Sequence, residues 1–114
     1  MRVKIIKEKI SKLDVERAAR NSFGEMVKAV VDIEKEILTL GGGLHADGEA
    51  LLLQEGSKQE NLWGINIYPQ RRKDEWIEFT ALINIRPAQE NRSMEIQNPN
   101  IRVGIKKIVN GLIE

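Results

Sequence analysis

The chemistry that this sequence could support lies on two stretches typical of β-strands, residues 62–69 and 76–87. Side chains alternate between the two faces of a strand, so each stretch directs polar residues to one side and apolar residues to the other. If the strands are neighbours, their polar residues form one patch, which Lys28 and Asp32 could join: Asn66, Tyr68, Glu78, Asn84 and Arg86. Glu78 and Arg86 could fix the polar groups of a ligand, or could form a surface ion pair worth at most about 1 kcal/mol.

Two interpretations of this patch stay open. It could be the solvated face of an antiparallel sheet, on which cross-strand polar pairs contribute little. Against this, asparagine is depleted in strands and glycine weakens them, so Gly64, Asn66 and Asn84 cost stability that a purely structural surface could avoid. Local rules tend to be broken at functional sites, which favours a ligand-binding surface.

The only histidine, His45, lies in a glycine-rich segment between a strand and a helix, where loops often carry function. It could ligate a divalent metal with Asp47 and Glu49, but one histidine without cysteine is a poor ligand set. It could act as a general base, yet the sequence identifies neither a nucleophile nor a substrate cleft. An ordinary loop histidine is the simplest interpretation, and His45 stays a candidate ligand-binding residue because of its position.

A second polar loop, Asn91 to Ser93, precedes the last predicted helix. Arg92 in this loop could clamp a carboxylate or a phosphate with bidentate geometry, although a solvated arginine is the more common case. The spacing of Gly43 and Gly48 matches a phosphate loop, but the lysine and hydroxyl residues of that motif are missing. We therefore expect no cofactor and no metal.

The composition indicates one soluble domain. A chain of 114 residues can enclose one hydrophobic core and is too short for two, so residues 1–114 are expected to form a single domain. The absence of cysteine excludes disulfides and thiolate chemistry and fits the cytoplasm. No stretch resembles a signal peptide, and no apolar run approaches the roughly 20 residues that cross a bilayer. We expect a cytoplasmic protein without membrane contact.

The formal net charge of +1 creates no global field toward nucleic acid or anionic lipid. Basic residues nevertheless crowd the first twenty positions: Arg2, Lys4, Lys7, Lys9, Lys12, Arg17 and Arg20. A solvated rim is the ordinary interpretation of such a cluster. Nucleic-acid binding would require the first strand and the first helix to display these residues on one continuous face.

The periodicity of apolar residues, together with helix-capping residues and glycine or proline breaks, predicts the elements that would position these residues. Strands are predicted over 2–7, 26–33, 36–40, 62–69 and 76–87, and helices after Ser11, after Asp47 and after Asn98, the last with Pro99 at its first position. The order is β-α-β-β-α-β-β-α. It predicts an α+β fold with a mostly antiparallel sheet of about five strands and helices on one face.

Three segments carry a recognisable pattern: G-G-L-H-A-D-G-E-A-L-L-L from 42 to 53, G-S-K-Q-E-N-L-W-G-I-N-I-Y-P from 56 to 69, and I-N-I-R-P with N-R-S from 83 to 93. They resemble a family of small prokaryotic proteins known only as a domain of unknown function. The resemblance spans nearly the whole chain and implies a stand-alone cytoplasmic protein, but no activity or catalytic residue. The family pattern has a glycine where this chain has Glu90, which matters if that loop requires a positive φ.

Three functional hypotheses follow. The first is a binding module for a small polar ligand or a macromolecular partner, with these candidate residues: Asn66, Glu78, Asn84, Arg86, His45 and Arg92. The second is a hydrolase-like enzyme with His45, Glu78 and Arg86 in one pocket, which concavity and a perturbed pKa of His45 or Glu78 would favour. The third is a structural or self-associating protein, such as a homodimer, anchored by Trp63, Trp76 or Tyr68.

Overall fold

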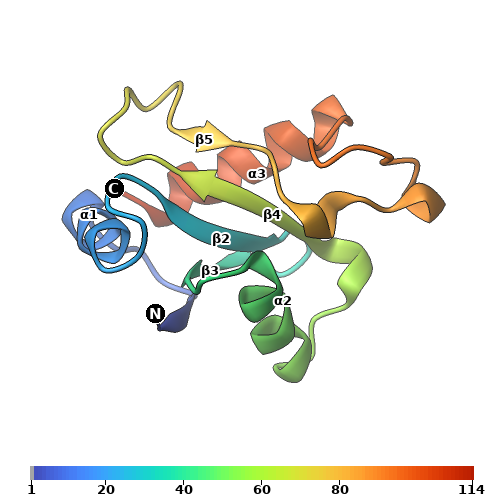
Figure 1. Ribbon diagram of the computed structural model, residues 1–114, viewed down its shortest axis with the longest axis horizontal. Helices are drawn as coiled ribbons and strands as arrows, with labels where there is room; N and C mark the ends of the chain where they lie inside the picture. The colour runs from blue at the N-terminus through green and yellow to red at the C-terminus, as the bar shows by residue number, and fades with distance from the viewer. Residues whose placement is uncertain (1) are drawn as a thin grey trace.

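Five antiparallel strands form one sheet in the order β1-β3-β2-β4-β5, with α-helices packed against it (Figure 1). The computed structural model describes residues 2–114. The elements are β1 (Val3–Ile6), α1 (Lys12–Arg20), β2 (Val27–Asp32), β3 (Ile37–Gly41), α2 (His45–Gln54), β4 (Leu62–Ile67), β5 (Ile77–Glu78) and α3 (Pro99–Leu112). The predicted α+β class, antiparallel sheet and order of elements are confirmed.

The larger core lies on the face of the sheet that α1 and α3 cover. Alternate residues of the central strand β2 point into this core and are at most 1% exposed: Val27, Ala29 and Val31. Residues spaced by three or four positions on the helices meet them, with Val15 and Ala19 from α1 and Ile105, Ile108 and Val109 from α3. The period of two in the strand and the period of 3.6 in the helices therefore bury one continuous apolar surface.

Two of the predicted helix starts are confirmed by their caps. The Ser11 hydroxyl accepts a hydrogen bond from Asp14 N at 3.1 Å, and the Asp14 carboxylate accepts one from Ser11 N at 3.0 Å, which completes a capping box. The Asn98 side chain accepts from Asn100 N at 2.8 Å, and Pro99 is the first residue of α3.

Within residues 2–114, no helix is both long enough and apolar enough to cross a membrane.

Helix α2 packs on the opposite face, where Leu52 meets Val30 and Leu62 in a smaller core. The expectation that all helices cover one face is therefore wrong. The physical reason is that Val30 and Leu62 make the second face apolar as well, so that face also needs a cover. Gly48 allows the close approach of α2, because a Cβ at this position would lie 2.5 Å from Thr39 Oγ1.

The start of α2 also differs from the prediction. Asp47 was expected to cap this helix, but α2 begins three residues earlier than that, at His45, with Leu44 as its N-cap. The Asp47 carboxylate accepts a hydrogen bond from Leu44 N at 3.0 Å, so it reaches back to the start of the helix from within the first turn. The earlier start places His45 on the helix rather than in a loop.

The strand predicted over residues 76–87 is wrong beyond Glu78. After β5 the chain leaves the sheet through two short 3₁₀ turns, η2 (Leu82–Asn84) and η3 (Pro87–Gln89). Ala81 N donates to Met94 O at 3.1 Å, so this segment pairs with a later part of the chain instead of extending β5. The alternation that predicted a strand fails in the structure, because Leu82 is 70% exposed while Asn84 is fully buried.

Within residues 2–114, two non-glycine residues adopt left-handed backbone, Glu36 in the turn between β2 and β3 and Glu90 directly after η3. Glu90 has φ 60° and ψ 27°, at the position for which the resemblance implies a glycine. The loop before Asn91 therefore does require a positive φ, and Glu90 adopts it at a steric cost that glycine would not have.

Replacing Glu90 by glycine should stabilise the protein. Relief of the left-handed strain outweighs the extra backbone entropy of glycine in the unfolded chain by up to about 1 kcal/mol. Chemical denaturation of wild type, Glu90→Gly and Glu90→Ala measures the effect. The alanine variant loses the same side chain but keeps a Cβ, so equal stability of the two variants would contradict a backbone origin.

Candidate binding site on the open face of the sheet

Three polar residues form a row across the face of the sheet that carries α2. The strand register places Lys28 of β2 opposite Asn66 of β4, and Asn66 opposite Glu78 of β5. Lys28 and Glu78 are half-buried, and Asn66 is 6% exposed. Side chains of directly opposite residues lie within contact distance of one another. The sequence prediction that Asn66 and Glu78 lie together, with Lys28 joining them, therefore agrees with the structure.

The Asn66 side chain is held in one orientation. Its amide nitrogen donates to Glu78 Oε1 at 2.7 Å and to the Thr80 carbonyl at 3.3 Å. Both acceptors would be lost if the amide were turned over, so the positions of nitrogen and oxygen are fixed. The carbonyl oxygen Oδ1 is buried and has no partner among the described residues. This arrangement leaves an oriented acceptor without a hydrogen bond.

Three other buried side-chain atoms lack a partner within residues 2–114: Glu49 Oε2, Trp63 Nε1 and Trp76 Nε1. Glu49 Oε2 lies 3.8 Å from the Arg86 guanidinium, so its charge is compensated. The two indole nitrogens belong to side chains of the larger core. The Asn66 oxygen differs from all three because it belongs to a row of polar, partly exposed residues.

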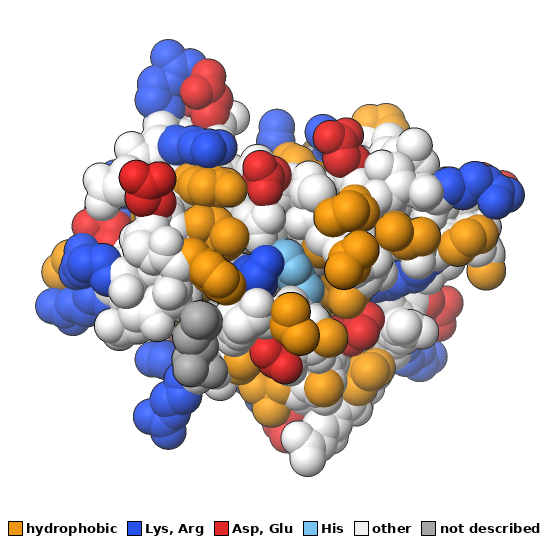
Figure 2. Space-filling model, in the orientation of Figure 1, with side chains coloured by type: hydrophobic (Ala, Val, Ile, Leu, Met, Phe, Trp, Pro, Cys, Tyr) orange, Lys and Arg blue, Asp and Glu red, His pale blue; other side chains and the backbone are white. Residues whose placement is uncertain are grey.

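His45 joins this row from the first turn of α2. Its Nε2 lies 2.8 Å from the Ile65 carbonyl, which can only accept, so Nε2 carries the hydrogen and the neutral ring has its lone pair on Nδ1. Gly64 makes room for the ring, because a Cβ there would lie 3.1 Å from His45 Cδ2 and 2.6 Å from the Ala81 Cβ. Figure 2 shows the histidine near the centre of this face, with a basic side chain beside it.

The pKa of His45 lies below its ordinary value of 6.5. Burial is the main cause, because it disfavours the charged imidazolium, and the charge of Lys28 acts in the same direction. The hydrogen bond to the Ile65 carbonyl, a hydrogen bond that the charged ring can make to the Asn66 side chain, and the Glu78 carboxylate oppose the shift without cancelling it. His45 is therefore neutral at pH 7 and presents an acceptor to its surroundings.

Asn84, a predicted site residue, has a structural role. Its side-chain Oδ1 accepts from Gly64 N at 2.8 Å, and its Nδ2 donates to Gly64 O at 2.9 Å and to Met94 O at 3.1 Å. The side chain thus pairs with β4 as the backbone of a neighbouring strand would. All of its donors and acceptors are engaged inside the fold, so Asn84 does not face the row with Asn66.

Arg86 is likewise held inside the protein. Its guanidinium donates to the carbonyls of Ile83, Gln59 and Leu62 and lies 4.6 Å from the centre of the Trp63 ring. Burial lowers its pKa, and the Glu49 carboxylate opposes this. Among the described residues, neither a hydrogen bond nor an ion pair joins Arg86 to His45 or Glu78. His45 and Glu78 therefore lie close together without the third residue of the hydrolase hypothesis.

The remaining predicted residues lie apart from the row. Arg92 is exposed, and its neighbour Asn91 is buried, donating to three backbone carbonyls and accepting from Gln97 N. Asp32 is also buried, accepting from the backbone of the β2–β3 turn and from the Ser57 hydroxyl at 2.6 Å. The polar sequence around Asn91 indicated a loop, but nothing in it indicated that this side chain organises the loop.

The aromatic residues expected to anchor a partner are mostly internal. Trp63 is 1% exposed and Trp76 is 3% exposed, so neither reaches the surface. Tyr68 is half-buried, with the Arg71 guanidinium 3.7 Å from its ring centre.

In the part of the chain that the structure describes, no three His, Asp or Glu side chains gather as metal ligands.

Residues 4–112 match the model of a family described as a protein of unknown function, DUF5674. The chain belongs to this family. The match covers nearly the whole chain and confirms the resemblance noted from its sequence segments. No curated protein and no solved structure matches the chain. The function of this DUF5674 protein therefore has to be inferred from its own site.

Removing the Asn84 side chain should destabilise this DUF5674 protein strongly. Asn84→Ala leaves the Gly64 N–H and carbonyl buried without partners, which costs about 2 to 4 kcal/mol of unfolding free energy. Chemical denaturation measures the loss. Asn110→Ala, at an exposed position of α3, serves as the control and should change stability by no more than about 0.5 kcal/mol. Equal effects of the two substitutions would refute the structural role of Asn84.

His45 should make the fold less stable in mild acid. Because its folded pKa is below 6.5, the unfolded chain takes up a proton first, so stability is unaffected above that value and declines as the pH falls from 6.5 through the folded pKa. NMR of the single imidazole should give a midpoint below 6.5. Denaturation of wild type and His45→Gln at several pH values should show the decline in wild type alone; a midpoint above 6.5 contradicts the assignment.

Proposed function

We propose that this protein is a binding module whose polar row, Lys28, Asn66, Glu78 and His45, recognises a small neutral ligand rich in N–H donors. The observation that carries the proposal is the Asn66 carbonyl oxygen, which is buried, fixed in direction and unpartnered. A buried acceptor without a hydrogen bond costs about 1 to 3 kcal/mol. A ligand N–H that displaces the side-chain atoms covering this oxygen and bonds to it would recover that free energy on binding.

The chemistry of the row favours a donor group over an acceptor group. Besides Asn66 Oδ1, the neutral His45 ring offers the lone pair of Nδ1, and Glu78 has a second oxygen that makes no hydrogen bond within residues 2–114. A primary amide, a urea or an amino-substituted heterocycle carries several N–H donors in one plane and matches these acceptors. Lys28 supplies a donor for a ligand carbonyl or ring nitrogen.

The charges of the row favour a neutral ligand. Lys28 and Glu78 carry opposite charges, and the lowered pKa keeps His45 uncharged at pH 7. An ionic ligand would gain attraction from one charge and repulsion from the other. Apolar side chains border the row, since Phe23 lies under the Lys28 ammonium at 5.2 Å and the exposed Leu44 precedes His45. Such a border suits the flat faces of an amide-bearing or heterocyclic ring.

Two matched pairs of compounds test the proposal, adenosine with purine riboside and nicotinamide with methyl nicotinate. In each pair only the first member carries an NH₂ group. At least one NH₂ member should bind in calorimetric titration, and its counterpart should bind about tenfold more weakly, because the buried acceptor then stays unpaired. Equal binding of the two members of each pair, or no binding by any of the four, would contradict the proposal.

Variants of the same row locate the binding. Asn66→Ala removes the acceptor and should abolish the preference for the NH₂ compound while leaving the protein folded. Asn61→Ala, in the turn η1 (Gln59–Asn61) before β4, is the matched control and should leave the preference unchanged. If the preference survives in Asn66→Ala, the binding lies elsewhere and this assignment of the row is wrong.

A further inference from the structure

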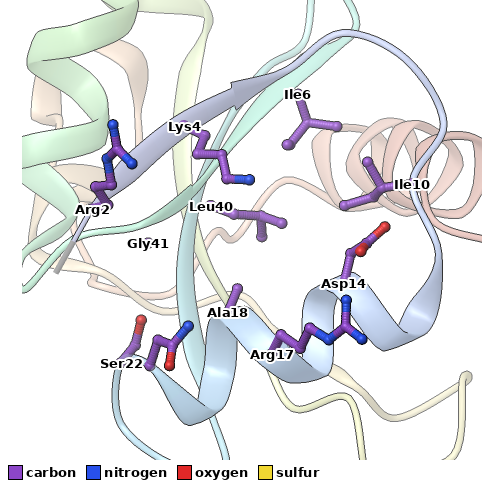
Figure 3. Close-up of a pocket in the computed structure, with 11 residues that line it drawn as sticks. Arg2, Lys4, Ile6, Ile10, Asp14, Arg17, Ala18, Ser22, Leu40 and Gly41 are labelled. Atoms are coloured by element: carbon purple, nitrogen blue, oxygen red, sulfur yellow. The ribbon is translucent and has the colours of Figure 1, made fainter.

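A cavity lies on the other face of the sheet, between the edge strand β1 and helix α1 (Figure 3). Its volume is about 460 Å³, within the range of pockets that hold small organic ligands. It opens where α1 packs over β1 and β3 near the start of the chain. We name it the α1–β1 pocket, and its lining includes Arg2, Lys4, Ile6, Arg17, Ala18 and Leu40.

The pocket has an apolar floor. Ile6 and Leu40 come from the sheet and belong to the larger core, while Ala18 on α1 and Ile10 in the loop between β1 and α1 pack against that core. These side chains offer a surface on which an apolar body can be buried, with the gain of about 25 cal/mol for each Å² removed from water. Within this lining there is no aromatic ring on which a nucleobase could stack.

The rim of the pocket is basic. Lys4 and Arg17 approach the opening from β1 and α1, and Figure 3 shows the Lys4 ammonium extended over the cavity and the Arg17 guanidinium beside Asp14. Neither cation, nor Arg2, forms an ion pair with another described residue. Asp14 is the single acidic group of the lining, and its carboxylate caps α1 through Ser11 N. The rim therefore carries three positive charges against one negative charge.

We infer that the α1–β1 pocket binds a small amphipathic carboxylate, with its apolar body on the floor and its carboxylate between Lys4 and Arg17. An arginine and a lysine on opposite sides of one opening can both donate charge-assisted hydrogen bonds to such a group. Three of the seven basic residues in the first twenty positions, Arg2, Lys4 and Arg17, thus line this pocket. A continuous groove with aromatic rings, as single-stranded nucleic acid requires, does not form in this lining.

The test titrates the whole protein with sodium octanoate, below the critical micelle concentration, and monitors binding by ¹H–¹⁵N NMR. Saturable shifts should be confined to residues 2–6, 10, 14–22 and 40–41. Octanamide has the same chain without the charge and should bind about fivefold more weakly, because it loses the two ionic contacts at a solvent-exposed rim. Equal affinity for octanoate and octanamide, or the absence of saturable shifts with octanoate, would overturn the inference.

Substitutions test separately what the rim and the floor of the pocket contribute to octanoate binding. Lys4→Gln with Arg17→Gln should weaken octanoate binding about fivefold or more, whereas Lys7→Gln with Lys107→Gln makes the same change of net charge off the pocket and should leave affinity unaltered. Ala18→Leu fills the floor and should abolish binding while α1 stays helical. Octanoate binding that persists in Ala18→Leu would exclude this pocket as the site.

A short single-stranded oligonucleotide and the Asn66→Ala variant complete the experiment. The oligonucleotide should leave the resonances of the pocket residues unshifted. If it shifts these resonances and octanoate does not, the pocket binds nucleic acid and the inference is wrong. Asn66→Ala should bind octanoate like the wild type, because Asn66 lies on the other face of the sheet. Loss of octanoate binding in this variant would contradict the separateness of the two sites.

Discussion

The outer edge of β4 is completed by side chains, and the rest of that face depends on this arrangement. β5 pairs with only two residues of β4, so most of the strand would otherwise present unpaired backbone groups. The Asn84 amide pairs with both the N–H and the carbonyl of Gly64, and the Arg86 guanidinium bonds to the carbonyl of Leu62. Asn91 in turn holds the Asn84 carbonyl at 2.8 Å. Two buried polar side chains, Asn84 and Arg86, thus replace a further strand, and Asn91 holds Asn84 in place.

This edge also determines the geometry of the polar row. Asn84 draws η2 against β4, and Ala81 and Ile83 come so close to Gly64 that no side chain fits there. The absence of a Cβ at Gly64 in turn leaves room for the His45 ring, which reaches the Ile65 carbonyl. The Asn84–Gly64 pair therefore determines both how the sheet ends and where the imidazole lies.

Local sequence signals predicted most elements of the fold but not this edge. Strand alternation in β2 and β4, the Ser11 capping box and the Asn98-Pro99 start of α3 act within a few residues, so they can be read from the sequence. A polar residue that alternates with apolar ones looks the same whether it faces solvent or pairs with a distant backbone. Asn84 pairs with a residue twenty positions away. For that reason residues 76–87 resembled a regular strand, and Asn84 and Arg86 resembled surface residues.

The three residues that break strand rules on this face can now be separated by cause. Gly64 is required by the contacts with His45 and Ala81, and Asn84 is required by the backbone of Gly64. Asn66 has no such requirement, because its amide nitrogen is satisfied while its oxygen is buried without a partner. A β-branched residue there would suit the strand and would bury no unsatisfied acceptor. The unpaired Asn66 oxygen therefore costs stability, and this separates Asn66 from the polar residues that hold the edge together.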